Sequence, residues 1–272
     1  MNQDEFISNL ETEIKISKLS YYTLRNYLDS NKKLLIYSNK QPIEINQQDI
    51  KIFLANRMNN KSSSSTILFL SAIKFAFSSL LNKDPTADIK RPKNEKKIPI
   101  VLTRKEVYDL IKNSETNKNK LILQLLYSSG LRVSEIVKIK PIDLDFSENI
   151  GWVREGKGKK DRFIIISKKL SDKLEKFIKK NSDWNYVFSK NKPLTTRNIQ
   201  KIVKKISKKA GIKKEVHPHT FRHSYATHLL EDGVDIRKIQ VLLGHSSLTT
   251  TQIYAHVSNT ELKKITNPLD KI

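Results

Sequence analysis

The first part of the chain carries apolar residues at helical spacing. They recur three or four positions apart over residues 22–37 and again over residues 50–58, as on one face of an amphipathic helix. Four serines at residues 62–65 precede a more continuous apolar stretch, residues 67–77. Because serine is a preferred helix-capping residue, this pattern predicts a central helix that begins near the serines.

The helical pattern breaks before residue 100. Three prolines stand among charged residues over residues 84–99, which is typical of an interdomain connection. Thr103 and Glu106 then form a capping-box pattern that predicts the first helix of a new domain. We therefore expect a helical domain, a linker and a second domain, over residues 1–84, 85–99 and 100–272.

The second domain is predicted to be mostly helical with a small sheet. Residues 150–153 and 162–166 are strand-like and flank a turn rich in glycine and lysine, which predicts an antiparallel pair. Residues 195–210 place isoleucine and valine on one face and lysines around the other, which predicts a basic amphipathic helix. The predicted fold class is mainly α with a small antiparallel β-sheet (α+β).

Charge favours a polyanionic partner. The chain has 51 Lys and Arg against 28 Asp and Glu, a net charge of +23. Residues 1–97 hold 16 basic and 10 acidic side chains, and residues 98–272 hold 35 and 18, so +17 of the excess lies in the second part. Phosphate backbones are the obvious partner for such a surface. A compositional bias towards lysine explains the count alone equally well.

Composition also excludes some classes of protein. The sequence has no cysteine, which rules out disulfides, thiolate metal sites and cysteine nucleophiles. We expect no apolar run of membrane-spanning length, and residues 1–6 lack the pattern of a signal peptide. We therefore expect a soluble, cytoplasmic protein.

Tyr254 is the candidate nucleophile of a site that cuts phosphodiesters. A tyrosine has a pKa near ~10, so it attacks poorly at neutral pH unless neighbours take its proton and neutralise the phosphate. His219, Arg222 and His245 lie close before it in the sequence and are the residue types that this task needs.

Two arginines are candidates for a phosphate clamp. In-line displacement at a phosphodiester gathers negative charge on the non-bridging oxygens, and planar guanidinium groups meet these oxygens bidentately, as lysine cannot. Arg132, at the start of a predicted helix, and Arg222 would form this clamp. His245 would donate to the same oxygens.

The order of these residues resembles that of the tyrosine site-specific recombinases. The motifs are Gly-Lys-Gly-x-Lys-x-Arg at residues 156–162, His-x-x-Arg-His at 219–223, and Leu-Gly-His at 243–245 with a tyrosine nine positions later. They are most similar to the Xer chromosome-dimer resolvases, including the single-protein archaeal type. The resemblance spans nearly the whole chain.

The resemblance implies a mechanism without metal, ATP or another cofactor. Tyr254 would hold the 3′-phosphate covalently while Lys157 protonates the departing 5′-oxygen, and His219 would act as general base. Lys159 and Lys160 lie on the same turn and compete with Lys157 for the acid's role.

The resemblance also implies an assembly on double-stranded DNA. A two-domain C-shaped clamp would close on the duplex, with the predicted basic helix in the major groove. Dimers would synapse into tetramers that exchange strands through a Holliday junction at a dif-like site, and the tail after Tyr254 would dock on a neighbouring subunit. The candidate groove-binding side chains are Lys201, Lys204, Lys205 and Lys208.

Alternatives remain at this point. A phage or plasmid integrase or resolvase, a type IB topoisomerase and a catalytically silent DNA-binding protein fit parts of the pattern. The basic helix fits an ordinary solvated face, and the tail fits a frayed terminus. Glu135, three residues after Arg132, is interpreted either as an acid that orients that arginine or pairs with a neighbouring helix, or as an ordinary helix-surface acid. The other histidines are interpreted as structural or as neighbours of the site: His217, His223, His228 and His256.

Overall fold

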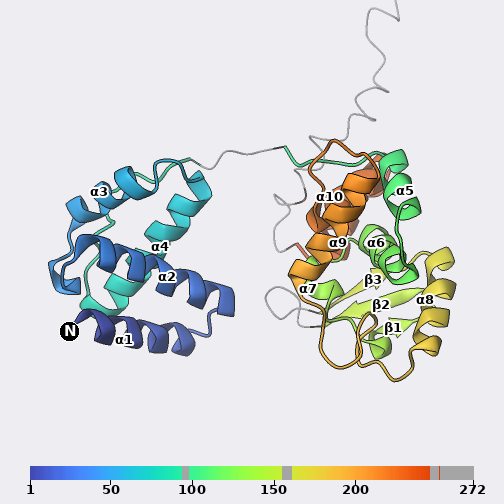
Figure 1. The fold of residues 1–272 in the computed structure, drawn as a ribbon, viewed down its shortest axis with the longest axis horizontal. Helices are drawn as coiled ribbons and strands as arrows, with labels where there is room; N and C mark the ends of the chain where they lie inside the picture. The colour runs from blue at the N-terminus through green and yellow to red at the C-terminus, as the bar shows by residue number, and fades with distance from the viewer. Residues whose placement is uncertain (94–97, 155–160, 246–250, 252–272) are drawn as a thin grey trace, which may run out of the picture. The chain divides into compact units, whose positions relative to one another are not determined.

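The computed structural model describes residues 1–93, 98–154, 161–245 and 251. The chain divides into two compact units, residues 1–97 and residues 98–272 (Figure 1). Each unit has its own hydrophobic core. The fold is mostly helical with one small antiparallel sheet, so the predicted fold class is confirmed.

The first unit is built from helices. Its α-helices are α1 (Gln3–Ile16), α2 (Tyr21–Ser38), α3 (Gln47–Arg57) and α4 (Ser63–Leu81), with a 3₁₀ turn at Pro42–Glu44. The three helices expected from periodicity are present as α2, α3 and α4. Helix α1, which periodicity did not single out, adds Phe6, Leu10 and Ile14 to the core.

Helix α4 is the central helix of this unit. Ser62 is its N-cap, accepting a hydrogen bond from the backbone N–H of Ser65 at 3.3 Å. Its buried side chains, among them Phe69, Ile73 and Phe77, pack in one core with α1 and α2. The expectation that no apolar run reaches membrane-spanning length is wrong for α4. This helix of 19 residues contains an 18-residue window with a mean hydropathy of 1.5, so it is long and apolar enough to cross a membrane by length and composition alone. A helix that fills the core of a protein needs the same kinds of residue.

The chain after α4 still belongs to the first unit. Asp84 accepts hydrogen bonds from the N–H and the hydroxyl of Thr86, and Ile89 packs against the first core. The beginning of the segment expected to be a linker is therefore folded onto the helices.

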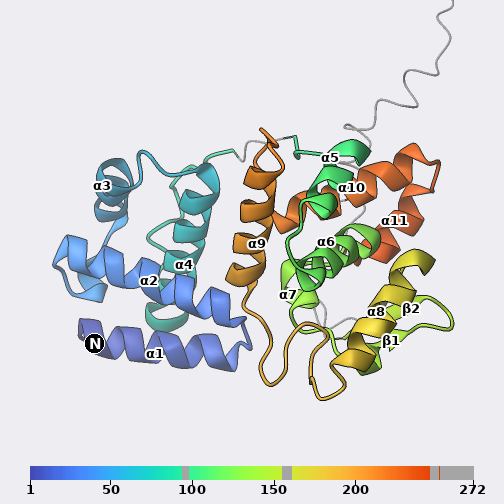
Figure 2. The same cartoon turned by 45° about the vertical axis from the view of Figure 1, so that its right-hand side comes forward.

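The second unit contains most of the remaining elements. Its α-helices are α5 (Arg104–Lys112), α6 (Asn117–Ser129), α7 (Val133–Ile136), α8 (Lys168–Lys180), α9 (Thr196–Lys209), α10 (Pro218–Glu231) and α11 (Ile236–Leu243), and a 3₁₀ turn spans Pro141–Asp143. The predicted capping box of α5 is present, with Thr103 and Glu106 bonded reciprocally. Helix α6 lies at the centre with α5, α8 and α10 packed around it (Figure 1 and Figure 2).

The sheet has three antiparallel strands in the order β1-β2-β3. They are β1 (Leu144–Asp145), β2 (Ile150–Val153) and β3 (Arg162–Ile165). The hairpin expected from the sequence is β2 with β3, and β1 is a further short edge strand. Val153 lies opposite Arg162 and Gly151 opposite Ile164, and these four residues are all buried. An arginine thus lies on the buried face of the sheet.

Gly130 ends α6 in a conformation that the surrounding packing requires. Its φ is +60°, and an ideal β-carbon there would lie 2.6 Å from Cδ1 of Tyr225 and 2.8 Å from Cδ2 of Leu243. Only glycine allows α10 and α11 to approach the end of α6 so closely.

We expect Gly130→Ala to lower the free energy of unfolding by about 2 to 3 kcal/mol, from left-handed strain and displacement of Tyr225. Gly211→Ala is the control, since its φ is +68° with nothing within 4 Å. It should cost about 1 kcal/mol. Denaturant unfolding measures both, and equal losses would contradict the packing argument.

Candidate functional site

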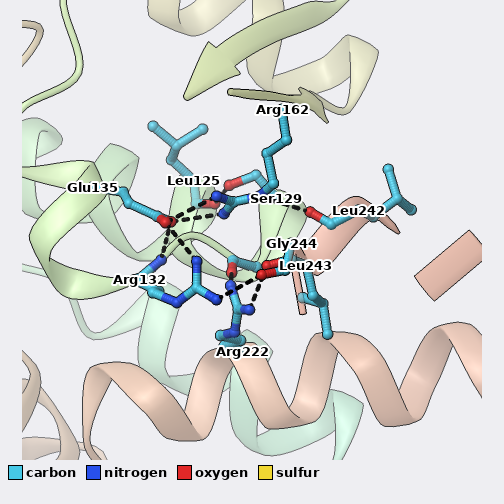
Figure 3. Close-up of polar contacts among 10 residues, drawn as sticks. Leu125, Ser129, Arg132, Glu135, Arg162, Arg222, Leu242, Leu243 and Gly244 are labelled. Atoms are coloured by element: carbon cyan, nitrogen blue, oxygen red, sulfur yellow. Dashed lines mark hydrogen bonds and ion pairs between the residues drawn. The ribbon is translucent and has the colours of Figure 1, made fainter. Parts of the chain in front are cut away.

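The turn after α6 brings Arg132 and Glu135 together. Arg132 is the N-cap of α7, and Glu135 lies in the first turn of that short helix. The carboxylate of Glu135 accepts the backbone N–H of Arg132 at 2.7 Å and its Nη1–H at 2.8 Å (Figure 3). The capping bond and the ion pair together fix the arginine at the helix end. Of the two interpretations of Glu135, the orienting partner is correct.

Arg162 binds the same carboxylate from another direction. Its Nη1 and Nη2 donate to the two carboxylate oxygens of Glu135 at 2.9 and 2.7 Å, and its Nε donates to the carbonyl of Leu242 at 3.0 Å (Figure 3). The side chains of Arg162 and Glu135 are only 7% and 8% exposed. Such bidentate geometry is the strong form of an arginine–carboxylate pair.

One carboxylate therefore serves two arginines. Burial would raise the pKa of Glu135, but the hydrogen bonds and charge of Arg162, with further bonds from Arg132, lower the pKa to about 2. Glu135 is ionised at neutral pH, and the three groups together keep one positive charge.

Arg222 adds a second candidate clamp arginine. It is 3% exposed in α10, and its Nη1 and Nη2 donate to the carbonyls of Gly130 at 2.6 Å and Leu243 at 2.5 Å. Figure 3 shows Leu243 beside Gly244, whose carbonyl accepts a hydrogen bond from Nη2 of Arg132 at 3.0 Å. The ends of α6 and α11 thus orient both guanidinium groups.

His219 and His245 complete the described part of the site. His219 lies one turn before Arg222, and burial, then the charges of Arg222 and Arg132, lower its pKa. The same three causes lower the pKa of His245 to about 3. Nδ1 of His245 lies 2.9 Å from Oγ1 of the buried Thr251. Both rings are neutral at neutral pH, so His219 can accept a proton and His245 can donate a hydrogen bond without carrying charge.

The structure thus brings together four of the six expected catalytic residues. Lys157 and Tyr254 lie outside the described residues, as do Lys159 and Lys160. Thr251, three residues before Tyr254, is described and contacts His245.

The four candidate DNA-binding lysines lie on α9 and are exposed. Ile199, Val203 and Ile206 form the buried face of that helix, as predicted. Lys205 pairs with Glu115 at 2.7 Å, and the neighbouring Lys209 pairs with the same carboxylate at 3.2 Å.

The remaining described histidines differ in surroundings. His228 is buried and its Nδ1 lies 2.7 Å from the hydroxyl of Tyr127, which fits the structural interpretation. Burial, then the charges of His219 and Arg222, lower the pKa of His223 to about 4. His217 is exposed, with Nε2 3.2 Å from Glu215. His256 lies outside the described residues.

Sequence reasoning missed Arg162 as a member of this cluster. A signal was available in the strand alternation, which puts Arg162 on the same face as Ile164 and Ile166, both buried. An arginine on a buried strand face needs a carboxylate or carbonyl partner, because an unpaired buried charge is very costly.

Together these groups have the chemistry that a phosphate-binding site of an enzyme that cuts nucleic acid would need. Guanidinium groups and neutral imidazoles converge on one corner of a strongly basic unit, where they would stabilise charge that develops on a phosphodiester.

The chain belongs to the phage integrase family of tyrosine recombinases, enzymes that cut and rejoin DNA. The model of the phage integrase family matches residues 100–261, and that of the phage integrase N-terminal SAM-like domain matches residues 6–86.

Individual relatives agree with this assignment. The chain is 38% identical to the tyrosine recombinase XerA of Thermococcus kodakarensis over 96% of its own length and 94% of the relative. A crystal structure of XerA recombinase matches with a TM-score of 0.57 at 32% identity, covering 96% of each chain. The XerH recombinase bound to its difH substrate shares the fold, with a TM-score of 0.76 at 22% identity over 95% of this chain and 83% of that one.

The shared carboxylate makes stability depend on pH. The folded pKa of Glu135 lies below its ordinary value of 4.5, so its stabilisation is complete above pH 4.5 and is lost as pH falls towards 2. The full effect is about 3 kcal/mol. We expect the stability difference between the parent and Glu135→Gln to shrink by roughly 2 kcal/mol from pH 6 to pH 3.

Denaturant unfolding at each pH measures this difference. Glu115→Gln is the control, because Glu115 pairs with two lysines but is exposed. An equal change with pH for both variants would show that Glu135 is not the special carboxylate.

Proposed function

We propose that this chain is a site-specific recombinase that cuts one DNA strand with Tyr254 and keeps the 3′-phosphate as a phosphotyrosyl intermediate. The observation that carries the proposal is the convergence of Arg132, Arg222, His219 and His245 at one corner, with Thr251 contacting His245 just before the tyrosine. The family supplies the reaction class, and the described part of the site supplies groups suited to binding the phosphate and to taking the proton of the tyrosine.

Each group has a definite task in this proposal. Arg132 and Arg222 bind the non-bridging oxygens of the scissile phosphate, and His245 donates to them. His219, neutral at working pH, takes the proton of Tyr254, and Lys157 gives a proton to the departing 5′-oxygen. No water attacks, so the energy of the phosphodiester is kept in the bond to tyrosine until a new 5′-hydroxyl replaces it. The scheme needs no metal and no nucleotide.

The substrate in this proposal is a chromosomal DNA site inside the cell. Likeness to recombinases named XerA and XerD, and to a XerH structure bound to difH, supports resolution of chromosome dimers at a dif-like site. The chain would act as a dimer on each site and as a tetramer in the synapse, through a Holliday junction. The first unit would bind the same duplex.

Tyr254→Phe tests the central assignment. The change removes one oxygen and keeps the ring, so folding and DNA affinity should stay within about twofold of the parent, and covalent trapping should vanish. The measurement is the yield of protein–DNA adduct on a nicked suicide duplex. An adduct that persists in the variant would contradict the nucleophile. Tyr108 is exposed, so Tyr108→Phe is the control and should leave the yield of adduct unchanged. Tyr225→Phe is unsuitable as a control because Tyr225 is buried.

Helix α9 is the proposed major-groove element. Its buried apolar face fixes which side is presented to solvent, and that side carries its lysines. Each phosphate that a lysine neutralises releases counterions and adds about 0.9 to the slope of log affinity against log salt.

Replacing Lys204, Lys205 and Lys208 by glutamine should therefore weaken DNA binding and reduce the salt slope by about 2 to 3. Helix α8 has the same amphipathic pattern, so Lys168, Lys176 and Lys180→Gln is a matched control that should change the slope little. Titrations at several salt concentrations measure both. An unchanged slope in the α9 variant would mean that these lysines form only a solvated face.

An apolar groove of about 930 Å³ supports docking of the C-terminal tail on a neighbouring subunit. Phe163, Ile165, Leu229 and Val241 are among the side chains that line it. The tail carries Leu262 and Ile265 among polar residues. Contact between neighbours would allow only two of four active sites to cut at once, which keeps the duplexes from breaking fully.

Deleting residues 259–272 should leave single-site binding intact, weaken synapsis and change the cleavage rate. Val241→Glu, which puts a charge on a 59% exposed residue of the groove, should reproduce these effects. Tyr108→Glu, equally exposed but not among the residues that line the groove, is the control. If the truncated protein and Val241→Glu both form normal tetramers and exchange strands at the parental rate, the tail is a frayed terminus.

A further inference from the structure

Arg162 is a buried charged side chain to which the proposed chemistry gives no task. It begins β3, opposite Val153 of β2, and therefore directly follows the connecting segment that contains Lys157 in the sequence. Among the described residues it contacts two other parts of the chain that belong to the site.

The first contact is the bidentate pair with Glu135, which also holds Arg132. The second is with the end of α11. Nε of Arg162 donates to the carbonyl of Leu242, and an ideal β-carbon on Gly244 would lie only 2.8 Å from Cδ of Arg162. The turn that leads to His245 thus packs directly on this side chain.

We propose that Arg162 is a positioning residue that keeps the guanidinium group of Arg132 correctly aimed for the scissile phosphate. The inference rests on the proposed function and adds a residue to it. Arg162 does not touch the reacting atoms itself. It acts through the carboxylate of Glu135 and through the Leu242–Gly244 turn.

Charge balance explains why an arginine is needed here. Without Arg162, Glu135 and Arg132 would form a neutral pair, and both carboxylate oxygens would be available to draw the Arg132 guanidinium away from DNA. With Arg162 present, Arg132 donates a hydrogen bond from Nη1 to Glu135 and another from Nη2 to the carbonyl of Gly244. Apolar side chains of similar volume in place of the whole buried ion pair are often as stable as the pair itself, so stability alone does not account for an arginine and a carboxylate here.

Single-turnover cleavage of a nicked suicide duplex at saturating protein tests the inference. Arg162→Met should cut about 100-fold more slowly, comparable to loss of one stabilising donor. Its DNA affinity should stay within about threefold. Arg162→Lys, which keeps the charge but not the forked contacts, should lose about tenfold. Arg154→Met is the matched control at the other end of the same connecting segment, with an exposed side chain, and should stay within threefold.

A double-mutant cycle shows whether Arg162 acts through Glu135. Adding Glu135→Gln to Arg162→Met removes the carboxylate that would otherwise draw Arg132 away from DNA, so the double variant should cut faster than the product of the two single effects. Independent, multiplicative losses would overturn the inference.

A substrate with a 5′-bridging phosphorothiolate separates this role from an effect on Lys157. Its sulfur leaves without a proton, so the substrate should rescue Lys157→Ala but not Arg162→Met. Rescue of Arg162→Met would place its effect in leaving-group protonation and overturn the inference.

Failure of the inference is distinguishable from failure of the proposed function. A parent protein that forms no covalent adduct would overturn both. A parent that forms adduct, with folded Arg162→Met cutting at the parental rate, would overturn the role of Arg162 alone. Cooperative thermal unfolding establishes that each variant is folded, and Arg162→Lys decides the matter if the methionine variant does not fold.

Discussion

A single buried carboxylate shared by two arginines organises the catalytic unit. Glu135 lies in the first turn of α7 and reaches Arg132 in the same turn and Arg162 at the start of β3. The carbonyls at the end of α11 complete the coordination of both guanidinium groups. Because a buried ion unpaired on any side is costly, these three segments are held in one arrangement. Arg222 joins them through the carbonyls of Gly130 and Leu243.

The electrostatic consequence is a site in which positively charged guanidinium groups lie beside two neutral imidazole rings. Burial and the nearby arginines keep the pKa of His219 and His245 below the ordinary value. A histidine that is neutral can accept the proton of a tyrosine, which an imidazolium cannot. The arginines therefore have two effects. In the proposed mechanism they would attract the phosphate, and they keep the pKa of the proposed base, His219, below its ordinary value. The second unit as a whole, residues 98–272, also has a positive net charge of +17.

Some of these features could be predicted from the sequence, and others could not. Local signals located α2, α4 and α9, because capping serines and threonines and apolar spacing act within a few residues. The order of motifs predicted Arg132, His219, Arg222 and His245 as members of one site, and the fold brings these four residues together. The partnership of Glu135 with Arg162 was missed, since it depends on strand pairing and on packing between residues 27 positions apart. Strand β1 was missed because a strand of two residues is too short to show an alternation of apolar and polar positions. The membrane-spanning length of α4 was also missed, because the helix at the centre of a core is as apolar as a membrane helix.

The central claim is that this corner serves Tyr254 as the attacking group. The most direct measurement is mass spectrometry of peptides from protein trapped on a nicked suicide duplex bearing a candidate recombination site. The account predicts one modified peptide, with a 3′-linked nucleotide on Tyr254. A nucleotide found on any other residue, or a cut strand with no covalently bound protein, would contradict the account.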